Sequence, residues 1–86
     1  MNTFKLIVSS PDGNIFEGDV YKLDLRSSEG EFAVMAGHVP FITHAIAGEC
    51  AVWIDDETKR VATSKGGLLT VAKDKTTFIC STFKFE

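Results

Sequence analysis

Turn-forming residues recur along the whole chain at short intervals, and this spacing limits the length of every regular element. The turns are rich in proline, glycine, asparagine and aspartate, which preset one backbone dihedral or tolerate positive φ. They fall at residues 10–14, 27–30, 37–40, 55–58, 65–67 and 73–75. No window of a dozen residues between them carries a helical period with caps. The chain therefore has to be built from short strands.

The segments between the turns alternate apolar and polar residues, as half-buried strands do. We expect strands over residues 4–9, 15–18, 19–26, 31–36, 42–47, 49–54, 59–64, 68–72 and 76–83. Gly18 marks the bend between the second and third of them, and Pro40 interrupts the chain because it has no amide hydrogen for a central strand. The pattern predicts an all-β fold: residues 1–86 as one small antiparallel β-sandwich or flattened barrel of eight to ten short strands.

Charge and hydropathy argue against several classes of protein. The 86 residues carry a net charge of -3 with scattered basic residues, whereas nucleic-acid binding relies on clustered Lys and Arg. No apolar run approaches the roughly 18–20 residues that span a bilayer, and the first residues lack the layout of a signal peptide. We expect a cytoplasmic protein with no nucleic-acid partner and no direct membrane insertion, in which Cys50 and Cys80 are reduced thiols.

Catalysis by this chain is not favoured. A hydrolase needs a nucleophile, a base and an orienting acid within reach of one another, and nothing in the sequence marks such a trio. His44 lies inside an expected strand, the two cysteines form no close ligand pair for zinc, and Gly66-Gly67 is followed by neither a helix nor the Lys-Ser/Thr of a phosphate loop. We therefore predict no catalytic residue, no metal and no cofactor.

The segment from Glu29 to Thr43 uses residue types that a scaffold rarely needs. His38 lies in a loop between Gly37 and Val39-Pro40, where it either bonds to nearby backbone or contacts a partner. Glu29 and Glu31 bracket Gly30, either as two solvated carboxylates or as a contact for a basic partner. The sequence leaves both pairs of alternatives open.

Three stretches together resemble one protein family along essentially the whole chain. Glu29-Gly30-Glu31-Phe32, followed by Gly37-His38-Val39-Pro40-Phe41-Ile42-Thr43, is similar to the E-G-E and P-G-H-A-P-L-L-T segments of the epsilon subunit of F-type ATP synthases. Phe4-Lys5-Leu6, Ser10-Pro11 and Phe16-Glu17-Gly18 match the family's opening, and Gly66 to Val71 resembles its S-G-G-x-L-E-V turn. The chain differs at Ala33, Ala36, Val39, Lys65 and Thr70, where the family commonly has Gly, Pro, Ala, Ser and Glu.

The resemblance implies a non-catalytic subunit of the rotating central stalk. Such a β-sandwich would bind the gamma subunit and the c-ring, so that ion translocation is coupled to ATP synthesis at the cytoplasmic face of the bacterial inner membrane. The residues that it would place against gamma are Ser10, His38, Thr43, Lys65 and Thr70. Those that it would place against the c-ring are Arg26, Ser27, Ser28, Glu29 and Glu31.

Family members commonly continue into a C-terminal helical hairpin that brakes ATP hydrolysis and, in some members, binds ATP. If the given sequence is complete, we expect neither that brake nor that nucleotide site. Near its end, Phe83 and Phe85 share strand parity with Ile79. They would then form an exposed aromatic patch, or else Phe83 closes the core and Phe85 frays.

Two other classes of function remain in competition with the rotor subunit. The first is a free-standing β-sandwich adaptor that binds a peptide or a sugar through its loops. A sugar binder usually shows several exposed aromatic rings on one face, yet Trp53 and Tyr21 are the only tryptophan and tyrosine. The second is an enzyme, which would depend on His38 for turnover.

Overall fold

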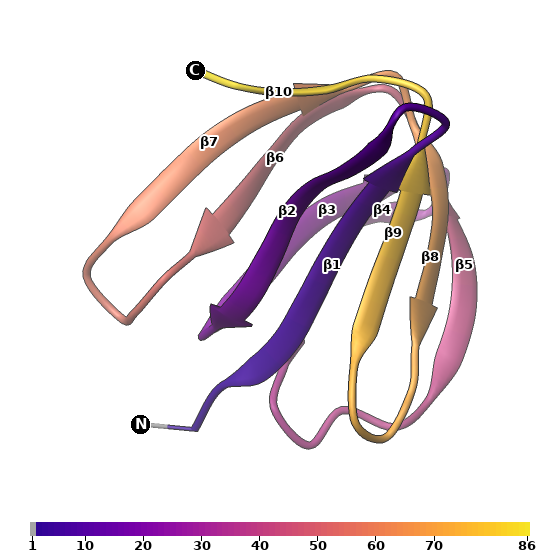
Figure 1. Cartoon of the computed structure of the whole chain (residues 1–86). Coiled ribbons are helices and arrows are strands. Elements are labelled where there is room, and N and C mark those ends of the chain that lie inside the picture. The colour runs from indigo at the N-terminus through magenta and orange to yellow at the C-terminus, as the bar shows by residue number, and fades with distance from the viewer. Residues whose placement is uncertain (1) are drawn as a thin grey trace.

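The computed structural model describes residues 2–86, which form two five-stranded sheets packed face to face (Figure 1). The ten strands are β1 (Phe4–Ser10), β2 (Gly13–Val20), β3 (Lys22–Ser27), β4 (Gly30–Met35), β5 (Phe41–Ala45), β6 (Gly48–Trp53), β7 (Lys59–Ser64), β8 (Gly67–Val71), β9 (Thr76–Cys80) and β10 (Phe83–Phe85). The predicted all-β sandwich is confirmed, at the upper end of the predicted strand number. Among these residues, no helix is long and apolar enough to cross a membrane.

Sheet A has the strand order β2-β1-β9-β8-β5, and sheet B has the order β10-β7-β6-β3-β4. Seven of the eight strand pairings are antiparallel. The exception is β1 with β9, which run parallel with Leu6 opposite Thr76 and Ser9 opposite Ile79. Figure 1 shows the indigo first strand lying against the yellow ninth, so sheet A joins strands that are far apart in the sequence, while the last strand, β10, belongs to sheet B.

The core lies between the two sheets and is filled by every second residue of most strands, the spacing that the sequence predicts. Its largest fully buried apolar side chains are Phe78, Leu6, Leu23, Leu69, Val8, Val20, Val34 and Val52. Cys50 from sheet B and Cys80 from sheet A are buried in the same core as free thiols. Burial, together with the neighbouring Cys80 and Glu49, raises the pKa of Cys50 to about 11.

The predicted bend at Gly18 is wrong. Strand β2 continues through Gly18, which pairs with Leu6, and ends at Val20. A Cβ on Gly18 would stand 3.6 Å from the ring of Phe16, an ordinary van der Waals distance, so neither a bend nor a close contact requires a glycine here. The chain turns instead at Tyr21, whose amide donates a hydrogen bond to the carbonyl of Trp53 at 2.7 Å as the chain enters sheet B.

The predicted strand over residues 76–83 is also wrong, because it is two strands in different sheets. Strand β9 ends at Cys80, and β10 begins at Phe83 on the edge of sheet B. The crossing breaks the expected parity: Ile79 is 51% exposed on sheet A, whereas Phe83 is 5% exposed and closes the core. Phe85 does not fray, since its ring packs edge to face on Phe83 and Phe16 at centroid distances of 5.2 and 5.9 Å.

Two hairpin turns of the sandwich share one construction. In the β1–β2 turn, the hydroxyl of Ser10 donates to the carbonyl of Gly13 and accepts from the amide of Asp12. In the β3–β4 turn, the hydroxyl of Ser27 donates to the carbonyl of Gly30 and accepts from the amide of Glu29. Each closing glycine has a φ near +120°, a region that L side chains rarely adopt. The turns are therefore specified by serine at the first position and glycine at the fourth.

Candidate functional site

The outer face of sheet A is apolar at its centre. Strand register aligns the outward side chains in two rows across β5, β8, β9 and β1. The half-buried and exposed members form a surface that we call the isoleucine face: Ile7, Ser9, Ile42, His44, Leu68, Thr70, Thr77 and Ile79. Ile42 is 67% exposed and Ile79 51% exposed. Contiguous apolar surface of this kind on a small domain commonly marks an interaction site.

The outer face of sheet B carries a cluster of charged side chains around Trp53 that already have partners. The ring of Trp53 lies between two ammonium groups, with Lys22 Nζ at 5.1 Å and Lys59 Nζ at 5.5 Å from its centroid. Its indole N–H donates to Asp24 at 2.9 Å, and Asp24 also pairs with Lys22 at 3.7 Å. This arrangement satisfies the polar groups within the sheet.

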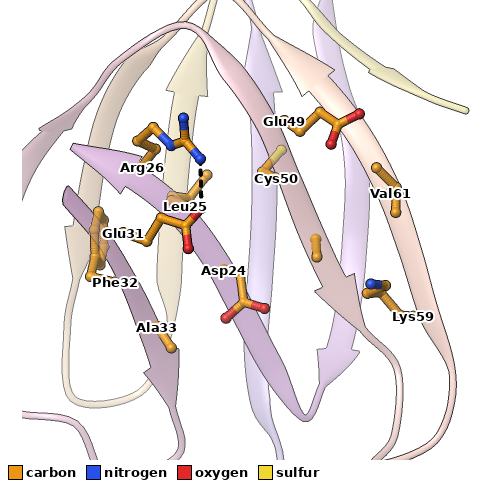
Figure 2. A pocket seen from close by; sticks show the side chains of 11 residues that line it. Asp24, Leu25, Arg26, Glu31, Phe32, Ala33, Glu49, Cys50, Lys59 and Val61 are labelled. Atoms are coloured by element: carbon orange, nitrogen blue, oxygen red, sulfur yellow. Dashed lines mark hydrogen bonds and ion pairs between the residues drawn. The ribbon is translucent and has the colours of Figure 1, made fainter. Parts of the chain in front are cut away.

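A hollow of about 440 Å³ lies on the outer face of sheet B. Its lining includes the small side chains of Ala33, Ala51 and Val61, and Figure 2 shows the Arg26–Glu31 pair toward one end and Lys59 toward the other. Arg26 Nη2 lies 2.6 Å from Glu31 Oε1, but both side chains are more than half exposed. Solvent screens such a pair, so it contributes little to stability.

A second hollow, of about 450 Å³, opens at the edge where β4 and β5 approach each other, and we call it the edge hollow. It is lined by Ser27, Glu29, Gly30, Glu31, Phe32, His38, Phe41, Ile42 and Thr43. Its aromatic wall is continuous, because the ring of Phe41 lies 4.8 Å from the ring of His38 and 6.2 Å from that of Phe32. The amide of Ile46 donates to the carbonyl of Arg26 at 2.8 Å and holds the β3–β4 hairpin beside the end of β5.

His38 bonds to nearby backbone, which is one of the two roles that the sequence left open. Its amide donates to the carbonyl of Met35 at 3.2 Å, and its Nδ1 lies 2.8 Å from the carbonyl oxygen of Val39. A carbonyl only accepts, so Nδ1 carries the hydrogen and the neutral ring keeps Nε2 as an acceptor. Because the side chain is exposed, this second nitrogen is accessible from outside.

The structure does not bring the five residues predicted to face gamma into one cluster. Ser10 and Lys65 lie at one end of sheet A, where Ser9 is opposite Ile79 and Gly67 is opposite Cys80. His38 lies in the β4–β5 loop near the other end of sheet A. Thr70 belongs to the isoleucine face, and Thr43 lines the edge hollow. These five residues therefore extend along the length of sheet A.

The residues predicted to face the c-ring lie together on a single hairpin. Arg26 and Ser27 end β3, Ser28 and Glu29 form the turn, and Glu31 belongs to β4. Ser27, Glu29 and Glu31 line the edge hollow, which also holds His38 and Thr43. The two predicted contact sets therefore meet in one hollow, although the sequence treats them as separate.

Sequence reasoning missed the apolar members of both surfaces. Phe32, Phe41 and Ile42 line the edge hollow, and Ile7 and Ile79 lie on the isoleucine face. A signal for the face is present in the strand alternation: Ile42 and Ile79 stand at the parity opposite to the buried Ala45 and Phe78. An isoleucine at an outward position is a residue that a purely structural strand does not require.

Within residues 2–86, no group of three His, Cys, Asp or Glu side chains could hold a metal ion. His44 lies exposed on β5 opposite Leu68, as an ordinary sheet histidine. The side-chain hydrogen bonds of the described residues join no serine, threonine or cysteine to a histidine. The geometry thus offers surfaces for docking and no assembled catalytic group.

Comparison with known proteins decides the family. A family model described as the β-sandwich domain of the ATP synthase delta/epsilon chain matches residues 3–86. The chain belongs to this family. The ATP synthase epsilon chain of Anoxybacillus flavithermus is 34% identical over 79 residues, which cover 92% of this chain and 58% of that relative. The resemblance stated from the Glu29–Thr43 segment is confirmed.

Solved structures show the same sandwich fold. A chain in the Euglena gracilis mitochondrial ATP synthase (OSCP/F1/c-ring) superposes with a TM-score of 0.89 at 21% identity, covering 96% of this chain and 53% of that one. A chain in the central stalk/c-ring structure of the Tetrahymena thermophila mitochondrial ATP synthase gives 0.81 at 9% identity, covering 95% and 66%. These likenesses concern the fold. The chain spans little more than half the length of the Anoxybacillus and Euglena proteins that it matches.

Proposed function

We propose that this protein is a non-catalytic rotor subunit of the central stalk of an F-type ATP synthase. It binds the gamma subunit and the c-ring, and it helps to couple ion translocation to ATP synthesis as a peripheral protein at the cytoplasmic face of the bacterial inner membrane. Membership of the delta/epsilon family over residues 3–86 is the observation that carries the proposal. The matched folds in two ATP synthase assemblies support it.

The isoleucine face is the surface that fits gamma. It contains Thr70, and Ser10 and Lys65 lie at one end of the same sheet. Burying the exposed side chains of Ile42 and Ile79 against a partner removes apolar area from water, worth roughly 25 cal/mol per Å² before the costs of association. His38 and Thr43 continue this surface around strand β5.

The β3–β4 hairpin is the surface that fits the c-ring. It projects Ser28 and Glu29 at its tip, and Arg26 and Glu31, the strand pair next to the turn, form an exposed ion pair. Polar contacts at such an exposed site are salt-dependent and individually modest. The hairpin therefore provides position and specificity, while the isoleucine face provides most of the affinity.

The test is complex formation with the cognate gamma subunit, measured by size-exclusion chromatography and calorimetry for the wild type and for His38→Ala. We expect a one-to-one complex that the substitution weakens. Tight binding that the substitution leaves unchanged would keep the rotor subunit and remove His38 from the interface. No binding to a well-folded gamma would reject the rotor subunit in favour of an adaptor that binds another partner.

A further inference from the structure

We propose that the gamma-facing surface turns around strand β5 into the edge hollow, where a basic side chain of gamma lies between Glu29 and His38. This inference rests on the proposed function and extends it. It makes Glu29, which the family resemblance places against the c-ring, a residue that also contacts gamma. The occupant is a segment of gamma that presents one arginine or lysine beside an apolar side chain.

Ile42 connects the two surfaces. It pairs with Thr70 on the isoleucine face and also lines the edge hollow, and it is 67% exposed. Strand β5 is the edge of sheet A, so beyond it no further strand separates the face from the hollow. A partner that covers Ile42 from the outer face therefore reaches the rim of the hollow.

The charges of the hollow select a cation. Glu29 and Glu31 both line it, and its lining contains no lysine or arginine. Glu31 is already paired with Arg26 at 2.6 Å, whereas Glu29 takes part in no salt bridge among the described residues. The exposed ring of His38 lines the same hollow, and its Nε2 can accept a hydrogen bond when the ring is neutral.

The aromatic wall favours a delocalised cation over a neutral group. Phe32, Phe41 and His38 present a run of rings, each in contact with the next. A guanidinium can stack on such a wall while donating to a carboxylate, and an ammonium can make the weaker version of both contacts. The hollow of sheet B shares Phe32 and Glu31, but its lining already holds Arg26 and Lys59, whereas the lining of the edge hollow has no basic side chain.

The walls of the hollow are fixed before a partner arrives. The hydroxyl of Ser27 holds the hairpin turn through Gly30 and the amide of Glu29. The bond from Ile46 to Arg26 then fastens that hairpin, close to its turn, to the chain just after β5. Binding therefore requires little ordering of this chain, which reduces the entropic cost of association.

The experiment is calorimetric titration of the full chain with isolated gamma, without the c-ring, for the wild type, Glu29→Gln, His38→Ala and the double variant. Glu49→Gln is the matched control, because Glu49 is an exposed carboxylate on the other hollow and loses the same charge. We expect Glu29→Gln to weaken binding about three- to five-fold in low salt. The ratio of the variant and wild-type dissociation constants should approach one near about 0.5 M salt. Glu49→Gln should leave the affinity unchanged.

If one basic side chain touches both residues, the double variant loses less affinity than the product of the two single losses. Equal affinities for Glu29→Gln and Glu49→Gln, with the wild type binding tightly, would overturn the inference and leave the rotor subunit intact. Fully multiplicative losses would show separate contacts and would also overturn it. A wild type that does not bind gamma would remove the proposed function itself, and the inference with it.

Discussion

The outer faces of the two sheets differ in whether their side chains have partners within the chain. On sheet A the exposed Ile42 and Ile79 stand among half-buried threonines with nothing above them. On sheet B the ring of Trp53 is enclosed by Lys22 and Lys59, and Asp24 accepts its indole hydrogen. One face therefore satisfies its side chains within the chain, and the other presents apolar area that a partner can bury. The difference indicates which side of a small sandwich is built for docking.

The largest effect on stability should come from adding a side chain at Gly67, where β8 packs closely beside β9 in sheet A. A Cβ on Gly67 would collide with the carbonyl oxygen of Ile79, so Gly67→Ala has to separate β8 from β9. We expect it to lower the free energy of unfolding by about 3 kcal/mol or more in urea titrations. Gly13→Ala is the control: it has nothing within 4 Å of the new Cβ, and its φ of +122° should cost only about 1–2 kcal/mol. Equal losses would contradict the close packing of sheet A.

Introducing one negative charge on the outer face of either sheet tests which face binds gamma. Ile79→Asp should weaken gamma binding by about 30-fold or more, because it places a carboxylate in the centre of the isoleucine face. Thr63→Asp places the same group at an exposed position of β7 on sheet B and should leave the affinity unchanged. Calorimetry measures both, and circular dichroism checks that both variants fold. The comparison of the faces fails if Thr63→Asp weakens binding as much as Ile79→Asp.

The polar cover of sheet B should contribute to stability without affecting binding. Trp53→Phe keeps a ring for Lys22 and Lys59 but removes the hydrogen bond to Asp24. We expect a loss of about 0.5–1.5 kcal/mol in the free energy of unfolding, since the bond is part-buried. The affinity for gamma should stay at the wild-type value. A weaker gamma complex would show that sheet B also faces the partner.

The last effect is a loss of stability that appears only at alkaline pH. It compares the buried cysteines that the two sheets contribute to the core, Cys50 from sheet B and Cys80 from sheet A. Burial raises the pKa of Cys50 to about 11 and also raises that of Cys80. A raised pKa means that the folded state favours the neutral thiol. The contribution of the buried thiol to the free energy of unfolding is therefore complete below about pH 9 and is lost as the pH rises towards 11. Cys50→Ala should flatten the decline in stability between pH 9 and 11 more than Cys80→Ala does. If Cys80→Ala flattens the decline more, Cys80 and not Cys50 has the more strongly raised pKa.

Much of the fold could be predicted because alternation and turn residues act locally. Ser10 to Gly13 and Ser27 to Gly30 form their turns from their own side chains, so the sequence is sufficient to place them. The bend predicted at Gly18 is wrong because a glycine alone does not decide between a turn and a continuing strand, and the pairing of Gly18 with Leu6 keeps it inside β2. The sequence prediction missed the crossing at Ser81-Thr82 because strand-like residues continue through it. The sheet to which β9 and β10 each belong is decided by partner strands that are distant in the sequence.

The candidate site was predictable as a set of residues but not as an arrangement. His38 and Glu29 were selected by residue type and by family resemblance, and both line the edge hollow. That they line the same hollow depends on the contact between Phe32 and Phe41, which lie on edge strands of different sheets. Ile42 and Ile79 required knowledge of which face of sheet A is free, and only the assembled sandwich supplies that.

The parallel pairing of β1 with β9 also governs how this protein can be made in a cell. The first hairpin is synthesised early, but the edge formed by Leu6 to Ser9 has no partner until Thr76 to Ile79 have been translated. At about 5–20 residues per second, that edge stays bare for several seconds on each nascent chain. During this time it can pair with any other unpaired strand nearby, including one from a neighbouring ribosome. Production of this protein is therefore most vulnerable when translation is slowest, and chaperones that shield its first twenty residues should raise its yield.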